Sequence, residues 1–145
     1  MKINVHTIII RPINDVFNYL ADVRNDVHWR DEVTQHELIS EGPRGVGSEG
    51  RIRVNQFGRE TESTWKCTRS DPPEHIEWEL TSGPLLGNAG YKLKAIDGGT
   101  DFTYYGTAKL AGIMRLFSPI IQFLSNKLFQ KDVENLKRIL ESNTP

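Results

Sequence analysis

The sequence predicts an α+β fold in which a curved antiparallel sheet of about seven strands wraps a long C-terminal helix, with two short helices between the first and second strands. Two observations predict this class. Between residues 33 and 110, apolar and polar side chains alternate with a period of two, which is typical of strands with one covered face. From residue 118 to about residue 142, apolar residues recur at helical spacing. A sheet with one covered face needs one covering layer, and we expect the terminal helix to supply it.

The N-terminal part of the chain predicts one strand followed by two short helices. Residues 2–10 favour a strand, and Pro12 ends it and suits the first turn of a helix. A second short helix is expected around residues 27–29, capped by Asp22 or by Asn25. The apolar residues at helical spacing in the first helix are Ile13, Val16, Phe17 and Leu20.

The middle of the chain predicts a series of antiparallel strands. In four of them the charged residues fall on one face only; Glu77 and Glu79, for example, alternate with Trp78. We therefore expect the opposite, aromatic-rich face to be covered. Gly58 and residues 97–99 predict hairpin turns. The expected strands are residues 33–41, 49–57, 59–70, 74–81, 88–96 and 100–109.

The last part of the chain predicts one long helix. Ser118 and Pro119 are a favourable N-cap and first helical residue, and the pattern continues for roughly 24 residues, or about 36 Å of helix. Residues 113–117 form either a separate short helix or the first part of a helix kinked at Pro119. The apolar stripe expected to face the sheet consists of Phe117, Ile121, Leu124, Leu128, Phe129, Val133, Leu136 and Leu140.

Composition predicts an ordinary globular protein. The 145 residues fit one domain, residues 1–145, with 37% hydrophobic and 26% charged residues. A net charge of -1 predicts no overall attraction to nucleic acid or to an anionic membrane. The single cysteine, Cys67, excludes an internal disulfide and favours a reducing cytoplasm.

Neither apolar stretch of the chain predicts a targeting or membrane-spanning segment. The apolar run at residues 8–10 is too short for a signal peptide, and no small-residue cleavage site follows it. Residues 110–129 contain Arg115, Pro119, Gln122 and Lys127, whereas a membrane-spanning helix needs about 20 mostly apolar residues. We therefore expect a soluble, cytoplasmic protein with no stable membrane insertion.

Several short motifs follow one another along the chain. They are Arg-Pro-Ile-Asn-Asp-Val-Phe at residues 11–17, Leu-Ala-Asp at 20–22 with Trp29, Gly-Val-Gly at 45–47, Pro-Pro at 72–73 before Trp78, Gly-Gly-Thr at 98–100 and Asp-Val-Glu-Asn-Leu-Lys at 132–137. In these motifs and in its order of elements, nearly the whole chain resembles the Bet v 1-like, START-like (SRPBCC) superfamily, and within it the polyketide cyclase/dehydrase and lipid transport branch. The resemblance implies the helix-grip fold. It is specific for the fold and much less so for function.

The resemblance implies that a ligand binds between the sheet and the C-terminal helix, as in members that transfer lipids or cyclise polyketides. The same residues are compatible with a filled core, because the volume depends on how far the helix stands from the sheet. The residues expected to line a cavity are Trp29, Ile52, Val54, Gln56, Ser63, Trp65, Trp78, Tyr91, Tyr104, Met114, Phe117, Ile121 and Leu124.

The sequence does not predict a metal, a cofactor or a nucleotide. None of the four histidines has the spacing of a metal-binding motif, and there is no second cysteine. The glycines at residues 42–47 match no phosphate-binding motif and join strand to strand, so tight turns explain them better.

Three functions are compatible with this fold. The first is binding of a small hydrophobic or amphipathic, lipid- or polyketide-like molecule, by a monomer or a homodimer. The second is an enzyme of the cyclase/dehydratase type, although no catalytic residue can be assigned. The third is a protein-interaction or chaperone-regulator domain without a ligand. We expect the strand charges to point outward and the interior polar groups to be neutral, which favours binding over catalysis. Residues of the short helices, such as Asp22, Asp26 and His28, are also expected to be within reach of a cavity mouth.

Overall fold

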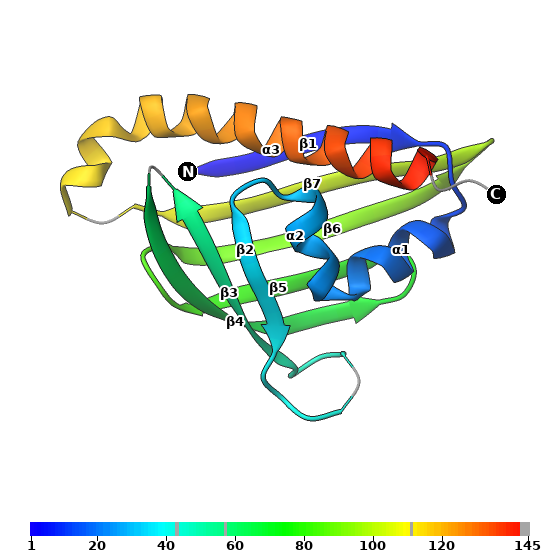
Figure 1. Cartoon of the computed structure of the whole chain (residues 1–145), viewed down its shortest axis with the longest axis horizontal. Coiled ribbons are helices and arrows are strands. Elements are labelled where there is room, and N and C mark those ends of the chain that lie inside the picture. Colours follow the sequence, from blue (N-terminus) through cyan, green and yellow to red (C-terminus); the bar gives the residue numbers. More distant parts are fainter. Residues whose placement is uncertain (43, 57, 111, 143–145) are drawn as a thin grey trace.

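A computed structural model of the chain describes residues 1–142 apart from residues 43, 57 and 111; the side chains of residues 113 and 114 are also not described. Figure 1 shows a curled sheet with the long helix along one side of it. The elements are β1 (Lys2–Ile9), α1 (Ile13–Ala21), the 3-10 helix η1 (Val23–Asn25), α2 (Asp26–Trp29), β2 (Val33–Leu38), β3 (Glu49–Gln56), β4 (Arg59–Asp71), β5 (His75–Ser82), β6 (Leu86–Ile96), β7 (Gly99–Lys109), the 3-10 helix η2 (Gly112–Phe117) and α3 (Ser118–Ser142).

The sheet is seven-stranded and antiparallel, with the strand order β1-β7-β6-β5-β4-β3-β2. Each strand from β2 to β7 pairs with its neighbour in sequence, whereas β1 pairs with β7. β1 and β2 therefore form the two edges of the sheet, and α1, η1 and α2 connect them across its concave side (Figure 1). With α3, this arrangement is the helix-grip fold, as predicted.

The alternation along the strands places apolar side chains on the covered face. In β3, Ile52 is buried while Arg53 is exposed, and in β4 Trp65 is buried while Glu62 is exposed. Arg53 and Glu62 form an ion pair of 3.2 Å on the outer face. The prediction that strand charges point outward is therefore confirmed for these strands.

Asp22 and Asn25 were both candidate caps for the second short helix, and they have different roles. The Asp22 carboxylate accepts a hydrogen bond from the backbone N–H of Arg24 and caps η1. Asn25 forms no side-chain cap; its amide donates to the carbonyl oxygen of Tyr19 instead. The short helices are thereby fixed against α1, and Asp26 and Trp29 are the buried residues of α2.

Helix α3 meets the rest of the fold along only part of its length. Val133, Leu136 and Leu140 in its C-terminal half are buried, and the helix packs against β1. In the N-terminal half, by contrast, Leu124 is 45% exposed, and Phe117 just before the helix is 52% exposed. The predicted single stripe facing the sheet is therefore wrong for residues 117–124. Helical spacing identifies one apolar face but does not determine how far the sheet reaches beneath it. No helix within the described residues is long and apolar enough to cross a membrane.

Candidate functional site

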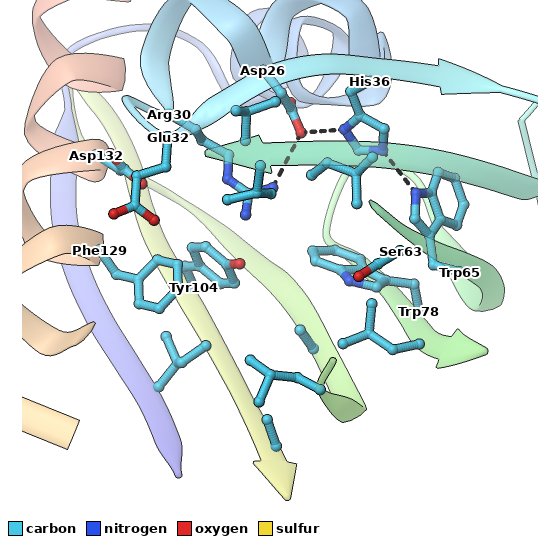
Figure 2. Close-up of a pocket in the computed structure, with 18 of the residues that line it drawn as sticks. Asp26, Arg30, Glu32, His36, Ser63, Trp65, Trp78, Tyr104, Phe129 and Asp132 are labelled. Atoms are coloured by element: carbon cyan, nitrogen blue, oxygen red, sulfur yellow. Dashed lines mark hydrogen bonds and ion pairs between the residues drawn. The ribbon is translucent and has the colours of Figure 1, made fainter. Parts of the chain in front are cut away.

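A cavity of about 150 Å³ lies between the sheet, α2 and α3 (Figure 2). A cavity of about this size in an engineered protein holds a benzene molecule, and typical ligand pockets measure about 300–1,000 Å³. The interior is therefore neither a completely filled core nor a large lipid-sized chamber. It has room for about one ring of a ligand in this conformation.

Most of the predicted cavity residues lie on the strands and do line the cavity. They are Ile52, Val54, Gln56, Ser63, Trp65, Trp78, Tyr91 and Tyr104. Trp29 is completely buried and is not among the lining residues that the structure describes, because it packs beneath the cavity wall with its ring 6.1 Å from that of Tyr91.

The predicted residues around the start of α3 do not contribute in the same way. Phe117 and Leu124 are exposed, and Ile121 is half-buried; none of the three is among the described lining residues. The side chain of Met114 lies outside the described residues. Leu128 and Phe129, one to two turns further along, line the cavity instead. The helix thus reaches the cavity later in the sequence than its apolar spacing indicated.

The prediction that the interior polar groups are neutral is wrong. The lining includes Asp26, Arg30, Glu32, Arg44 and Asp132. None of these residues belongs to a strand: they lie on α2, in the loops around β2 and on α3. The period-two pattern of the strands contains no information about them. Of these five residues, only Asp26 was expected from the sequence to reach the cavity.

A chain of short hydrogen bonds joins Asp26, His36 and Trp65 (Figure 2). The indole N–H of Trp65 donates to Nε2 of His36 over 2.7 Å. An indole nitrogen can only donate, so Nε2 carries the lone pair and the proton lies on Nδ1, which donates to the Asp26 carboxylate over 2.7 Å. Burial lowers the pKa of His36, in agreement with this neutral tautomer. Both ring nitrogens are thus occupied by the protein.

Two features of the β2–β3 region hold the hydrogen-bonded residues Asp26, His36 and Trp65 in place. The Trp65 ring lies against Gly50, on the facing position of β3, where a Cβ atom would come within 2.2 Å of two ring atoms. The guanidinium of Arg44 lies 5.2 Å from the Trp65 ring and donates to the carbonyl oxygens of Leu20 and Ala21 at the end of α1. Arg44 therefore connects the β2–β3 loop to α1.

Arg30 is the least satisfied polar group of the cavity. Its side chain is 13% exposed, and its Nη1 lies 3.4 Å from Asp26, a carboxylate that His36 already binds at a shorter distance. Its Nε is buried and has no hydrogen-bond partner among the described residues. The guanidinium lies 5.8 Å from the ring of Tyr104. Most of its five N–H donors are thus free to bind an acceptor.

The hydroxyls of Tyr91 and Tyr104 are also free. Each residue is only 3% exposed, and within the described part of the chain neither hydroxyl has a hydrogen-bond partner. Burial raises the pKa of both phenols, so both keep their protons near neutral pH. Together with Arg30 they form a group of unpaired donors, which we call the donor cluster (Arg30, Tyr91 and Tyr104).

The carboxylates of the cavity, in contrast, already accept hydrogen bonds. Glu32 accepts from the Gln56 amide over 2.7 Å, and Asp132 accepts from the backbone N–H of Asp31 over 3.1 Å. Burial raises the pKa of Asp132 to about 6. No group of three or more His, Cys, Asp and Glu residues in the described part of the chain is placed to hold a metal ion. The arrangement as a whole is therefore rich in free donors rather than in free acceptors.

The chain is similar in structure to several solved proteins. It matches a protein from Thermus thermophilus at 18% identity and a TM-score of 0.77, covering 98% of this chain and 95% of that one. It matches a START superfamily protein from Mycobacterium smegmatis at 12% identity and a TM-score of 0.78, covering 99% of each chain. These identities establish a shared fold alone.

A third solved structure is longer. The di-domain ARO/CYC protein BexL from the BE-7585A biosynthetic pathway matches at 13% identity and a TM-score of 0.77, with 99% of this chain and 48% of that one covered. In sequence, no curated protein matches the chain. The model of the family "Polyketide cyclase / dehydrase and lipid transport" does match, over residues 1–141. This match shows that the chain belongs to the polyketide cyclase/dehydrase and lipid transport family.

Proposed function

We propose that this protein binds a small apolar molecule that carries a carbonyl-type oxygen, as lipid- and polyketide-like compounds do. The observation that carries the proposal is the donor cluster. A buried donor without an acceptor costs about 1–3 kcal/mol, and the Nε of Arg30 is such a donor among the described residues. The hydroxyls of Tyr91 and Tyr104 line the same aromatic cavity. A ligand oxygen that accepts from them would remove that cost.

The walls of the cavity favour a flat ligand. The ring of Tyr91 lies 4.9 Å from that of Trp78 and 5.1 Å from that of Tyr104, which in turn lies 5.4 Å from Phe129. Aromatic surfaces arranged in this way contact a planar ring better than a branched chain. Burial of apolar ligand area, at about 25 cal/mol per Å², would supply most of the affinity.

The charges of the cavity favour a neutral oxygen over a carboxylate. Asp26, Glu32 and Asp132 already balance the two arginines, so a ligand carboxylate would add a further negative charge to a buried site. A ketone or ester oxygen accepts the same hydrogen bonds without that charge. In this respect the proposed ligand class is narrower than the general hydrophobic molecule that the family implies.

Acetophenone and isopropylbenzene provide a test, because they have nearly the same shape and differ in the carbonyl oxygen. We expect acetophenone to bind more tightly in calorimetric or NMR titrations, and we expect benzoate to bind more weakly than acetophenone. In Tyr104→Phe and Arg30→Met proteins the preference for acetophenone should decrease. Equal binding of the two uncharged probes to the native protein would refute the proposed role of the donor cluster. Mass spectrometry of an organic extract of natively purified protein would identify the natural ligand.

A second candidate function is catalysis of enolisation, as in a cyclase or dehydratase. Asp132 is the observation that supports catalysis, because a carboxyl group that lines the cavity and has a pKa of about 6 is well suited to act as a general base near neutral pH. It would remove a proton from the carbon next to the bound carbonyl, and the donor cluster would stabilise the enolate oxygen that forms. Exchange of the acetophenone methyl protons for deuterium measures this step directly. An Asp132→Asn protein that binds acetophenone but exchanges no faster than buffer would support it, whereas equal exchange by both proteins would exclude it.

The proposed cellular location is the cytoplasm. The one cysteine, Cys67, is a buried free thiol, and burial raises its pKa, which keeps it protonated and unreactive. This is compatible with a reducing compartment, and fractionation of cells that express the tagged chain would test it.

A further inference from the structure

The surface around the start of α3 is apolar and exposed. Its five residues are between 45% and 78% exposed, although large aliphatic and aromatic side chains are usually covered. We call this surface the α3 apolar face. It consists of Leu116, Phe117, Ile120, Phe123 and Leu124.

The spacing of these residues makes one continuous strip. Ile120, Phe123 and Leu124 are three and four residues apart, which places them on one side of a helix, and Leu116 and Phe117 extend the strip into η2. No element among the described residues covers it. Contiguous exposed apolar surface of this kind is typical of binding sites for partners or membranes.

The charged residues in the stretch of sequence that contains the α3 apolar face all have one sign. From residue 102 to residue 131 the sequence contains no aspartate or glutamate, but it contains Lys109, Arg115, Lys127 and Lys131. Lys131 forms an ion pair with Asp31, whereas Lys127 lies over the ring of Phe123 at 4.8 Å. Arg115 and Lys109 have no carboxylate partner among the described residues. Apart from Lys131, the cations that flank the strip in the sequence therefore have no carboxylate partner among the described residues.

We propose that the α3 apolar face docks this protein on the surface of an anionic lipid bilayer. Apolar side chains on one side of a helix enter the boundary between headgroups and acyl chains, and lysine and arginine beside them bind the lipid phosphates. A second copy of the chain fits less well, since a two-fold contact through this face would bring the same cations together.

The net charge of -1 does not oppose this proposal, because charges act over only about 8–10 Å at physiological salt. The local cations, rather than the whole molecule, therefore determine the attraction. Docking would also bring Leu128 and Phe129, which line the cavity one turn further along α3, close to the lipid. The proposal is nevertheless independent of whether the cavity binds a ligand.

Flotation of the intact protein with lipid vesicles tests the proposal. We expect binding to vesicles of phosphatidylcholine with a quarter phosphatidylglycerol, and little binding to phosphatidylcholine alone. A Phe117→Ser/Phe123→Ser protein should bind about tenfold more weakly. The matched control is Ile39→Ser/Val46→Ser, which removes two exposed apolar residues from the β2–β3 loop, at a distance from the start of α3 in Figure 1, and should bind like the native protein.

Charge and salt provide a second measurement that does not depend on the phenylalanines. An Arg115→Glu/Lys127→Glu protein should lose most of its binding, and raising salt from about 0.1 M to about 1 M should weaken the native protein, because the screening length falls from about 10 Å to about 3 Å. Equal binding to both vesicle types, or unchanged binding by the phenylalanine variant, would overturn the proposal. So would a native dimer, detected by light scattering, that the phenylalanine variant converts to a monomer.

Discussion

The indole N–H of Trp65 and the Nε2 atom of His36 lie 2.7 Å apart inside the fold, and this contact determines which nitrogen of the histidine carries its proton. That proton lies on Nδ1, which donates a hydrogen bond to the carboxylate of Asp26. A tryptophan on β4 thus determines the tautomer of the histidine that binds the carboxylate of Asp26 beside the cavity. The contact is buried, so its removal leaves an acceptor without a donor.

Replacing Trp65 by phenylalanine should therefore destabilise the protein. We expect a loss of about 2–3 kcal/mol in the free energy of unfolding, measured by urea denaturation, from the lost hydrogen bond and the smaller ring. Trp78→Phe is the control, because the Trp78 indole N–H has no hydrogen-bond partner among the described residues and the side chain is less buried. Equal losses in the two proteins would contradict the role of the His36 contact.

The effect of replacing Asp132 on the free energy of unfolding should depend on pH. The folded pKa of about 6 lies above the ordinary value of 3.8, so this carboxyl group favours folding below about pH 4 and loses that contribution as the pH rises through 6. Asp132→Asn should consequently stabilise the protein by about 1–3 kcal/mol at pH 7 and have little effect at pH 4. Urea denaturation at both pH values measures the difference. A variant that is less stable at pH 7 would show that the charged form of Asp132 is favourable.

Removing the hydroxyl group should affect ligand binding at Tyr104 and stability at the neighbouring Tyr105. Tyr104 has no hydrogen-bond partner in the described chain, so Tyr104→Phe should change stability by less than about 0.5 kcal/mol while it weakens binding of acetophenone. The Tyr105 hydroxyl donates to Glu77 over 2.6 Å on the outer face and lies 2.5 Å from Nε2 of His75.

Tyr105→Phe should therefore cost about 1–2 kcal/mol and leave ligand binding unchanged. Thermal denaturation and titration of both proteins check the pair. The interpretation fails if Tyr104→Phe is the less stable of the two proteins.

Gly50 should tolerate no side chain. An added Cβ atom would lie 2.1 Å from Cζ2 of Trp65, so Gly50→Ala must displace the indole and break its bond to His36. We expect a loss of about 2 kcal/mol or more. Gly45→Ala has open space and an unstrained backbone, and it should be nearly neutral. Measurement of both unfolding free energies separates crowding from the general effect of adding a methyl group.

The strands could be predicted from the sequence, because their alternation is local. Residues 59–70 were expected and Arg59–Asp71 is observed, and the covered positions of β3 and β4 follow the pattern. The charged groups of the cavity could not be predicted in the same way. Asp26 and Arg30 line the same cavity as Asp132 only because α2 and α3 pack together, and Asp132 lies about a hundred residues further along the sequence.

The exposure of the start of α3 could not be predicted from sequence patterns either. Phe117 and Leu124 continue the spacing of Val133 and Leu136, but the first pair is exposed and the second is buried. The periodicity of a helix shows which side is apolar, and only the placement of the other elements decides what that side contacts. For the same reason, periodicity does not distinguish a filled core from a cavity, because the difference depends on how far the helix stands from the sheet.

The pairing of β1 with β7 constrains how the chain assembles during synthesis. Lys2 lies opposite Thr107 and Ile9 opposite Thr100, so the strand made first receives its partner nearly last. A ribosome must therefore deliver about a hundred residues before this edge is protected, while β2 to β7 can join hairpin by hairpin as they emerge. Until then β1 carries unpaired backbone groups and apolar side chains, which leaves the nascent chain exposed to pairing with other chains.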